Sequence, residues 1–155
     1  MNVRMSLAVA VGFFALAPLA LGQKEKEKEK DGKDAIKAFE GDWRITAWEQ
    51  GGGELPKEFL DVAKWVVKGN KYTFTAGDQM EEGTLKADPD KKPAALDIEI
   101  TAGMDKGKTQ VGIYKVEKET ITICLARPGE KDRPTEFTAA GDKGFILITM
   151  KKRDD

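Results

Sequence analysis

EGDWRITAWEQGG, residues 40–52, is the first segment in which polar and apolar residues alternate, and it follows a run of charged residues. Successive side chains of a β-strand point to opposite faces, so alternation predicts a strand with one buried face. One face would carry apolar residues and the other would be mixed: Trp43, Ile45 and Ala47 against Arg44, Thr46 and Trp48. If Trp43 points into a core, Trp48 is therefore expected on the opposite face, exposed to solvent.

The same period of two recurs along the rest of the chain, with glycine, proline, asparagine and aspartate between the runs. The connections are too short for crossover helices, which indicates an antiparallel sheet that closes into a barrel or folds into a sandwich to remove its edges. We predict an all-β fold, a single small up-and-down barrel of about eight strands, preceded by a short helix near residues 33–39. Further strands are predicted at 65–68, 72–76, 80–87, 96–100, 110–116, 120–126, 135–140 and 145–151.

Residues 1–22 have the composition of a secretory signal peptide. Arg4 supplies positive charge, residues 7–21 are almost uninterruptedly apolar, and Ala20 and Gly22 are small residues at the positions an export peptidase reads. An apolar segment of about 15 residues is shorter than the roughly 20 that a membrane-spanning helix needs. We therefore expect cleavage before Gln23, export to the periplasm or the extracellular space, and no stable membrane anchor.

The segment that follows the predicted cleavage point is almost entirely charged. Residues 24–34, KEKEKEKDGKD, contain no large apolar side chain, so we predict a charged disordered linker over 23–34 and the barrel domain over 35–155. The whole chain carries 26 basic and 27 acidic residues with both signs interleaved. Nucleic-acid binding needs a basic face, so we expect no nucleic-acid partner.

The absence of histidine limits the chemistry available to the chain. It excludes Ser-His-Asp and Cys-His catalysis and removes the commonest metal ligand, so we expect a non-catalytic protein without metal or cofactor. Asp97 and Glu99 share a strand face that a glycosidase could use, but their alternation with apolar residues favours a solvated outer face. Residues 103–109, GMDKGKT, have three residues between the glycines where a phosphate loop needs four. Cys124, the only cysteine, is interpreted as a small buried hydrophobic residue rather than a reactive thiol.

Four residues are candidates for lining or gating a pocket in such a barrel: Tyr72, Phe74, Tyr114 and Arg133. A tyrosine hydroxyl at the end of a pocket can orient a ligand, although a barrel tyrosine often only packs. Arg127 and Arg133 bracket the loop RPGEKDRPTEF, and at a barrel mouth two guanidinium groups can hold a carboxylate or a phosphate. The alternative is that an arginine pairs with an acid of the same protein.

Gly-x-Trp at the start of the first strand, here Gly41 and Trp43, resembles the lipocalin and wider calycin pattern. The resemblance implies that the tryptophan plugs the closed end of the barrel. It also implies that a basic residue after the last strand, Lys152 or Arg153, packs over the indole ring. We take Gly41, Trp43 and Arg153 as the expected structural plug.

Several further segments, in this order, resemble a lipocalin-like domain family of unknown function that is expanded in planctomycete bacteria. They are GDWRITAWEQGGGELP, KKPAALDIEI, GKTQVGIYKV, TICLARPGEKDRPTEF and ILITMKKR. This resemblance implies the fold and export but no activity.

The expected function is therefore binding of a small apolar or amphipathic molecule inside the barrel, without catalysis. The alternative is an interaction module with a solid barrel, whose surface or loops bind a protein partner of the cell envelope. An exposed Trp48 would favour that alternative, because exposed tryptophan is typical of protein-recognition surfaces.

Overall fold

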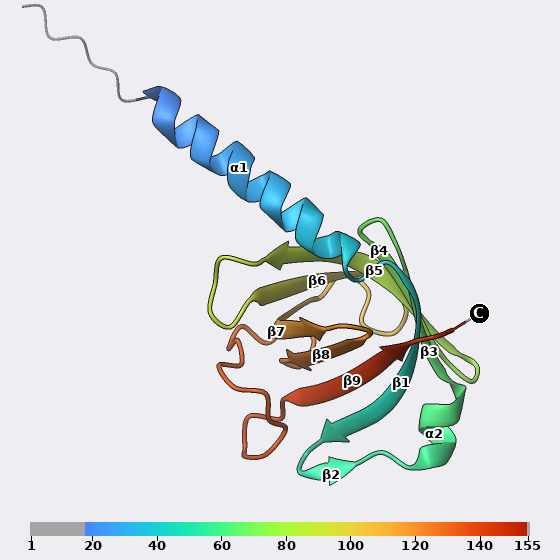
Figure 1. Cartoon of the computed structure of the whole chain (residues 1–155). Coiled ribbons are helices and arrows are strands. Elements are labelled where there is room, and N and C mark those ends of the chain that lie inside the picture. Colours follow the sequence, from blue (N-terminus) through green and yellow to red (C-terminus); the bar gives the residue numbers. More distant parts are fainter. Residues whose placement is uncertain (1–17, 155) are drawn as a thin grey trace, which may run out of the picture.

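A closed antiparallel barrel forms the body of the computed structural model, which describes residues 18–154 (Figure 1). Each barrel strand pairs with the next one along the chain, and the last strand pairs with the first, so the eight strands leave no open edge. The prediction of a small all-β up-and-down barrel is confirmed. The eight strands are β1 (Gly41–Gln50), β3 (Ala63–Lys68), β4 (Lys71–Ala76), β5 (Gln79–Asp88), β6 (Ala95–Ala102), β7 (Thr109–Glu117), β8 (Thr120–Leu125) and β9 (Ile146–Lys152).

Two short elements accompany β1 outside the barrel ladder. β2 (Gly53–Glu54) turns back along the end of β1, and α2 (Lys57–Val62) then leads into β3. β1 pairs with β3 only over its first four residues, 41–44, and the helix packs beside the remainder of β1. Phe59 of α2 therefore supplies an aromatic ring where ladder pairing between β1 and β3 has ended.

A β-bulge interrupts the regular alternation of β1. Ile45 pairs with Met150 of β9, but Ala47 pairs with the next residue, Thr149, so Thr46 is an extra residue. The extra residue shifts the pattern by one position, and Trp48 faces the barrel interior as Trp43 does. The expectation of an outward, exposed Trp48 is wrong for this reason, and the indole is partly buried against the core.

The N-terminal helix α1 (Pro18–Lys37) is much longer than the sequence pattern predicts. It includes residues 23–34, the expected disordered linker, and Glu and Lys are good helix formers that also pair here at i,i+4, as Lys33 does with Glu29. Figure 1 shows α1 projecting from the barrel, with its C-terminal part beside β5. Ile36 is buried there and Lys28 pairs with Asp88. Residues 1–17 of the predicted signal peptide lie outside the described residues.

The predicted strand at residues 135–140 is a loop. β8 pairs directly with β9, Leu125 opposite Ile146, so the ladder has no place for another strand between them. Parts of the intervening loop cover the outer faces of β7 and β8 instead. This cover buries two residues that point away from the barrel interior, Ile113 and Cys124.

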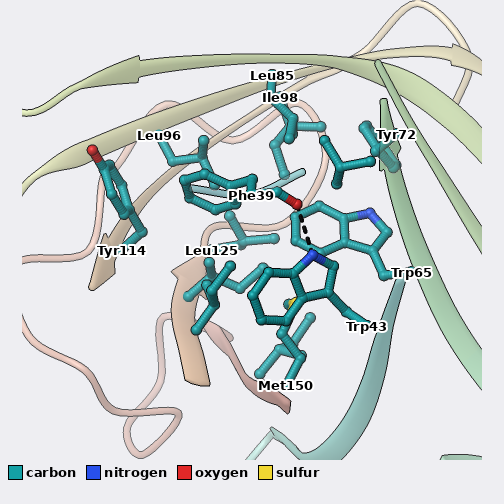
Figure 2. Close-up of a cluster of buried hydrophobic side chains, with 14 of the residues drawn as sticks. Phe39, Trp43, Trp65, Tyr72, Leu85, Leu96, Ile98, Tyr114, Leu125 and Met150 are labelled. Atoms are coloured by element: carbon teal, nitrogen blue, oxygen red, sulfur yellow. Dashed lines mark hydrogen bonds between the residues drawn. The ribbon is translucent and has the colours of Figure 1, made fainter. Parts of the chain in front are cut away.

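One end of the barrel is filled by aromatic and aliphatic side chains (Figure 2). Trp43 is 1% exposed, and its Nε1 donates a hydrogen bond of 2.6 Å to the carbonyl oxygen of Phe39. The Phe39 ring packs edge-on against Tyr114 and Trp65, with centroid separations of 5.0 and 6.3 Å. We call this end, where β1 begins, the plugged half.

Candidate functional site

A pocket of about 250 Å³ occupies the opposite half of the barrel interior, where β1 ends and β9 begins, which we call the distal half. Its base is hydrocarbon contributed by the inner faces of four strands: Ile45, Ile98, Ile123, Leu125, Ile148 and Met150. A pocket of this volume lies below the roughly 300 Å³ that begins the range of drug-sized ligand sites.

Four aromatic side chains line this pocket: Trp48, Trp65, Tyr72 and Phe74. The Trp48 and Phe74 rings lie 5.7 Å apart, and Trp65 and Tyr72 lie 5.6 Å apart, both at typical aromatic-pair separations. Phe59 packs edge-on against the Trp48 ring, at 5.8 Å, and so supports it. The bulge at Thr46 is what brings Trp48 to this wall.

Glu81 places a carboxylate on the inner face of the barrel. It lies opposite Phe74 in the β4–β5 ladder, two residues before Gly83, which lies opposite Tyr72. The Tyr72 hydroxyl donates a hydrogen bond of 2.8 Å to Glu81 Oε1. A side chain at position 83 would collide with the Tyr72 ring, so glycine there lets the tyrosine lie across β5 toward Glu81.

Burial sets the protonation of this pair. It raises the pKa of Glu81, and the charge of Asp105 raises it further, whereas the hydrogen bond from Tyr72 acts in the opposite direction. Burial also raises the pKa of the Tyr72 hydroxyl, with the neighbouring Glu81 adding to the effect. Tyr72 is therefore a neutral donor at physiological pH, and Glu81 Oε1 is the acceptor.

Gln50, Asp105 and Gln110 are the other polar side chains of the lining. Gln110 is buried and its Nε2 donates to the carbonyl oxygen of Ala126 at 3.0 Å. Asp105 is paired with Lys108 at 2.8 Å. The Trp48 Nε1 atom is buried and has no hydrogen-bond partner among residues 18–154. The pocket thus combines an apolar base, aromatic walls and a few polar groups, as small-molecule sites commonly do.

Of the four residues singled out from the sequence as lining or gating a pocket, the structure brings two together. Tyr72 and Phe74 both line the pocket. Tyr114 lies in the plugged half against Phe39, and Figure 2 shows its hydroxyl directed away from the other labelled rings.

Arg133 lies on the outside of the barrel. Its guanidinium donates to the carbonyl oxygens of Leu96 and Gly112 and pairs with Asp97 Oδ1 at 2.7 Å. These contacts hold the long loop against the outer face of β6 and β7. The sequence left two roles open for Arg133, binding a ligand or pairing with an acid of the same protein, and the structure shows the second.

The cation over the plug tryptophan belongs to Lys152. Its Nζ lies 6.0 Å from the centroid of the Trp43 ring, while the Arg153 side chain is exposed. Gly41 has a φ of 127°, and a Cβ there would lie 3.1 Å from Lys152 Cε. Glycine at this position therefore both permits the backbone conformation and leaves a passage for the lysine stem.

Asp97, Glu99 and Cys124, also considered from the sequence, lie away from the pocket. Asp97 and Glu99 are on the outer face of β6. Residues 103–107 form a loop before β7, and Asp105 of this loop lines the pocket. Cys124 is a buried free thiol whose Sγ lies 3.4 Å from the carbonyl oxygen of Thr138, and burial raises its pKa. Among the described residues, no group of three or more acidic or cysteine side chains is placed to hold a metal ion.

A larger groove, of about 1140 Å³, runs between α1 and the outer face of β5 and β6. Charged side chains of both signs line most of it, among them Lys28, Glu29 and Lys86, and most are open to solvent. The barrel pocket is instead lined mainly by aromatic and aliphatic side chains, so we take the smaller pocket as the candidate site.

Glu81 and Trp48 line the pocket but were not singled out from the sequence. Glu81 had a detectable signal, because counting back in twos from Leu85 and Ala87 through Gly83 places it on the inner face. Trp48 had none, because the bulge that turns it inward is defined only by pairing with β9.

No family model, curated protein or solved structure matches the chain. The resemblance to the lipocalin-like family consequently stays a prediction. Within residues 18–154, neither helix has the length and apolar character needed to cross a membrane.

Proposed function

We propose that this chain is an exported, non-catalytic binding protein of the lipocalin-like type, which holds a small amphipathic molecule in the distal half of its barrel. The observation that carries this proposal is the 250 Å³ pocket, lined mainly by aromatic and aliphatic side chains in a barrel whose other half is filled. A well-packed barrel of this size could have closed around its own side chains, as the plugged half does.

The polar groups favour an amphipathic ligand over a purely apolar one. Glu81 and Tyr72 form a hydrogen-bonded pair at the wall, and a ligand without polar atoms would leave the remaining acceptor positions of the carboxylate without water or partner. A ligand with one polar end can address these positions while its apolar part covers the isoleucine and leucine base.

The composition supports the other parts of the proposal. The chain has no histidine, and the pocket contains no cysteine or serine that could act as a nucleophile. Export is supported by the pattern of residues 1–22. The alternative, a protein-interaction module, was expected to have a solid barrel and an exposed Trp48, and neither feature is observed.

Native mass spectrometry of the protein secreted by a bacterium expressing the full chain tests this proposal. We expect the mass of residues 23–155 with an adduct of small-molecule size that leaves on denaturation. Ile148→Phe adds a ring inside the pocket and should abolish the adduct, whereas Leu147→Phe, on the outer face of the same strand, should keep it. An adduct that persists equally in Ile148→Phe, or a wild-type protein that carries none, would contradict binding in the barrel.

A further inference from the structure

Glu81 is the distinctive chemical group of the barrel pocket. Two carboxylates line the pocket, Glu81 and Asp105, and neither lysine nor arginine is among the lining residues. Asp105 is already paired with Lys108. Glu81 takes part in no salt bridge within residues 18–154, and its one side-chain partner is the neutral hydroxyl of Tyr72. In its ionised form Glu81 therefore has no countercharge among the lining residues.

A partly buried carboxylate is costly when its only partner is a neutral donor. Removing a carboxylate from water is unfavourable unless an opposite charge or several hydrogen bonds replace the water. One hydroxyl fills one of about four acceptor positions on the two oxygens. A ligand that brought a positive charge and N–H donors would satisfy the remaining positions and offset the cost.

The surroundings of Glu81 suit a cation as well. Phe74 lies directly opposite it in the ladder, with Tyr72 two residues away on the same strand, and Trp48 packs against Phe74. The faces of aromatic rings carry partial negative charge and attract cations, most strongly when water is excluded. The hydrocarbon base formed by Ile98, Ile123 and Ile148 accepts an apolar body.

We propose that the ligand is a small primary ammonium compound, whose cationic nitrogen pairs with Glu81 beside the aromatic wall and whose apolar body fills the base of the pocket. This inference rests on the proposed function, because it names the chemical class of the molecule in the same pocket. It also predicts exclusion of carboxylate ligands such as fatty acids, whose charge would lie next to Glu81.

Calorimetric titration of the secreted protein with three probes tests the inference: 2-phenylethylamine, 2-phenylethanol and 3-phenylpropionate. The probes share a phenyl ring on a two-carbon chain and differ in the polar group. At pH 7.5 we expect the amine to bind at least about tenfold more tightly than the alcohol, because a hydrogen bond to a charged partner is stronger than a neutral one. The anionic probe should bind most weakly. In Glu81→Gln the preference for the amine over the alcohol should fall below about threefold, with the affinity for the alcohol kept.

Glu82→Gln is the matched control, since it removes the adjacent carboxylate, which lies opposite Thr73 and points outward. It should retain the preference for the amine. Equal affinities of wild-type protein for amine and alcohol, or an unchanged preference in Glu81→Gln, would overturn the inference while leaving the proposed function intact. If none of the three probes binds, the proposed function itself fails.

The pH dependence of the wild-type protein supplies a second test that needs no variant. The amine stays protonated over the range used, as lysine does. Its affinity should fall as the pH is lowered and Glu81 takes up a proton, while the affinity for the alcohol stays constant. The other titratable groups near Glu81 are Tyr72 on β4 and Asp105, which is held by Lys108. An affinity for the amine that does not change with pH would contradict the proposal.

Discussion

The two tryptophans of the first strand have different roles, although they are only five residues apart. Trp43 is fully buried in the plugged half, and its indole N–H is used by the Phe39 carbonyl. Trp48 lines the pocket, and its buried indole N–H has no partner among the described residues. The first N–H therefore contributes to folding, whereas the second contributes no hydrogen bond to it.

Replacing each tryptophan with phenylalanine should separate these roles. Trp43→Phe leaves the Phe39 carbonyl oxygen buried without a donor, so we expect a loss of about 1–3 kcal/mol in the free energy of unfolding, with further loss from the smaller ring. Trp48→Phe removes an N–H that bonds to nothing described, and we expect a cost below about 1.5 kcal/mol. Urea unfolding followed by circular dichroism measures both, and a larger cost for Trp48→Phe would contradict this account.

At the residue scale, the sequence predicted the strand face on which a residue lies better than it predicted the residues that it contacts. Period-two alternation was enough to place Tyr72 and Phe74 on the inner face of β4. The contacts of Arg133 could not be predicted, because a loop arginine can reach any nearby carbonyl or carboxylate. Its partners Gly112 and Asp97 are 21 and 36 positions away along the chain. Such contacts depend on how the loop folds over the barrel.

At the scale of elements, β1 shows how a single extra residue changes the site. With regular alternation, Trp48 would leave the barrel and the pocket would lose one aromatic wall. The bulge at Thr46 restores it to the interior, opposite Ile148 of β9. Thr46 also donates from its hydroxyl to the carbonyl oxygen of Thr149, which fixes the bulged segment to β9.

Deleting Thr46 should make β1 regular and keep Trp48 inward, because Trp48 then follows Ile45 by two positions and can keep its pairing with Ile148. We expect tryptophan emission and acrylamide quenching to stay as in the wild-type protein, with a loss of about 1 kcal/mol from the missing hydroxyl bond of Thr46. Thr46→Ala is the control, because it loses the same bond and keeps the residue count. A red shift of the emission with stronger quenching in the deletion variant would show that the extra residue does not set the direction of Trp48.

Helices and strands were predictable where the local sequence pattern determines the secondary structure. They were not predictable where packing against other elements determines it. Leu96, Ile98 and Ile100 alternate with acids, and β6 follows that pattern. The helix over residues 23–34 has a charged sequence without an apolar stripe, and its C-terminal part docks on β5 through Ile36 and the close approach of Gly32 to Ala87. The segment 135–140 alternates like a strand, but its possible neighbours are already paired with each other.

At the scale of the whole molecule, the barrel is filled at one end and hollow at the other. The rings of Phe39, Trp43 and Tyr114 belong to the hydrophobic core at the filled end. Glu81 lies in the distal half and carries a charge that burial disfavours. Proteins commonly accept such local costs at sites that serve function, which is consistent with a binding role.

The free energy of unfolding of the whole protein should depend on pH, because burial disfavours the charged form of Glu81. The pKa of Glu81 is raised in the folded state, so between the unfolded value, near 4.5, and the folded value the native protein binds more protons than the unfolded chain. The contribution of Glu81 is therefore most favourable below pH 4.5 and declines as the pH rises through this window. Glu81→Gln should raise the free energy of unfolding at pH 7 and leave it nearly unchanged at pH 3.5. Urea unfolding at both pH values checks this, and destabilisation at pH 7 would contradict it.

The most direct test of binding in the distal half is an NMR titration of ¹⁵N-labelled protein with 2-phenylethylamine and 2-phenylethanol, following the three tryptophan indole N–H signals. We expect the signals of Trp48 and Trp65, which line the pocket, to shift on binding, while that of Trp43, held by Phe39 in the plugged half, stays in place. Unmoved Trp48 and Trp65 signals at millimolar probe, or shifts confined to residues on the outer face, would contradict it.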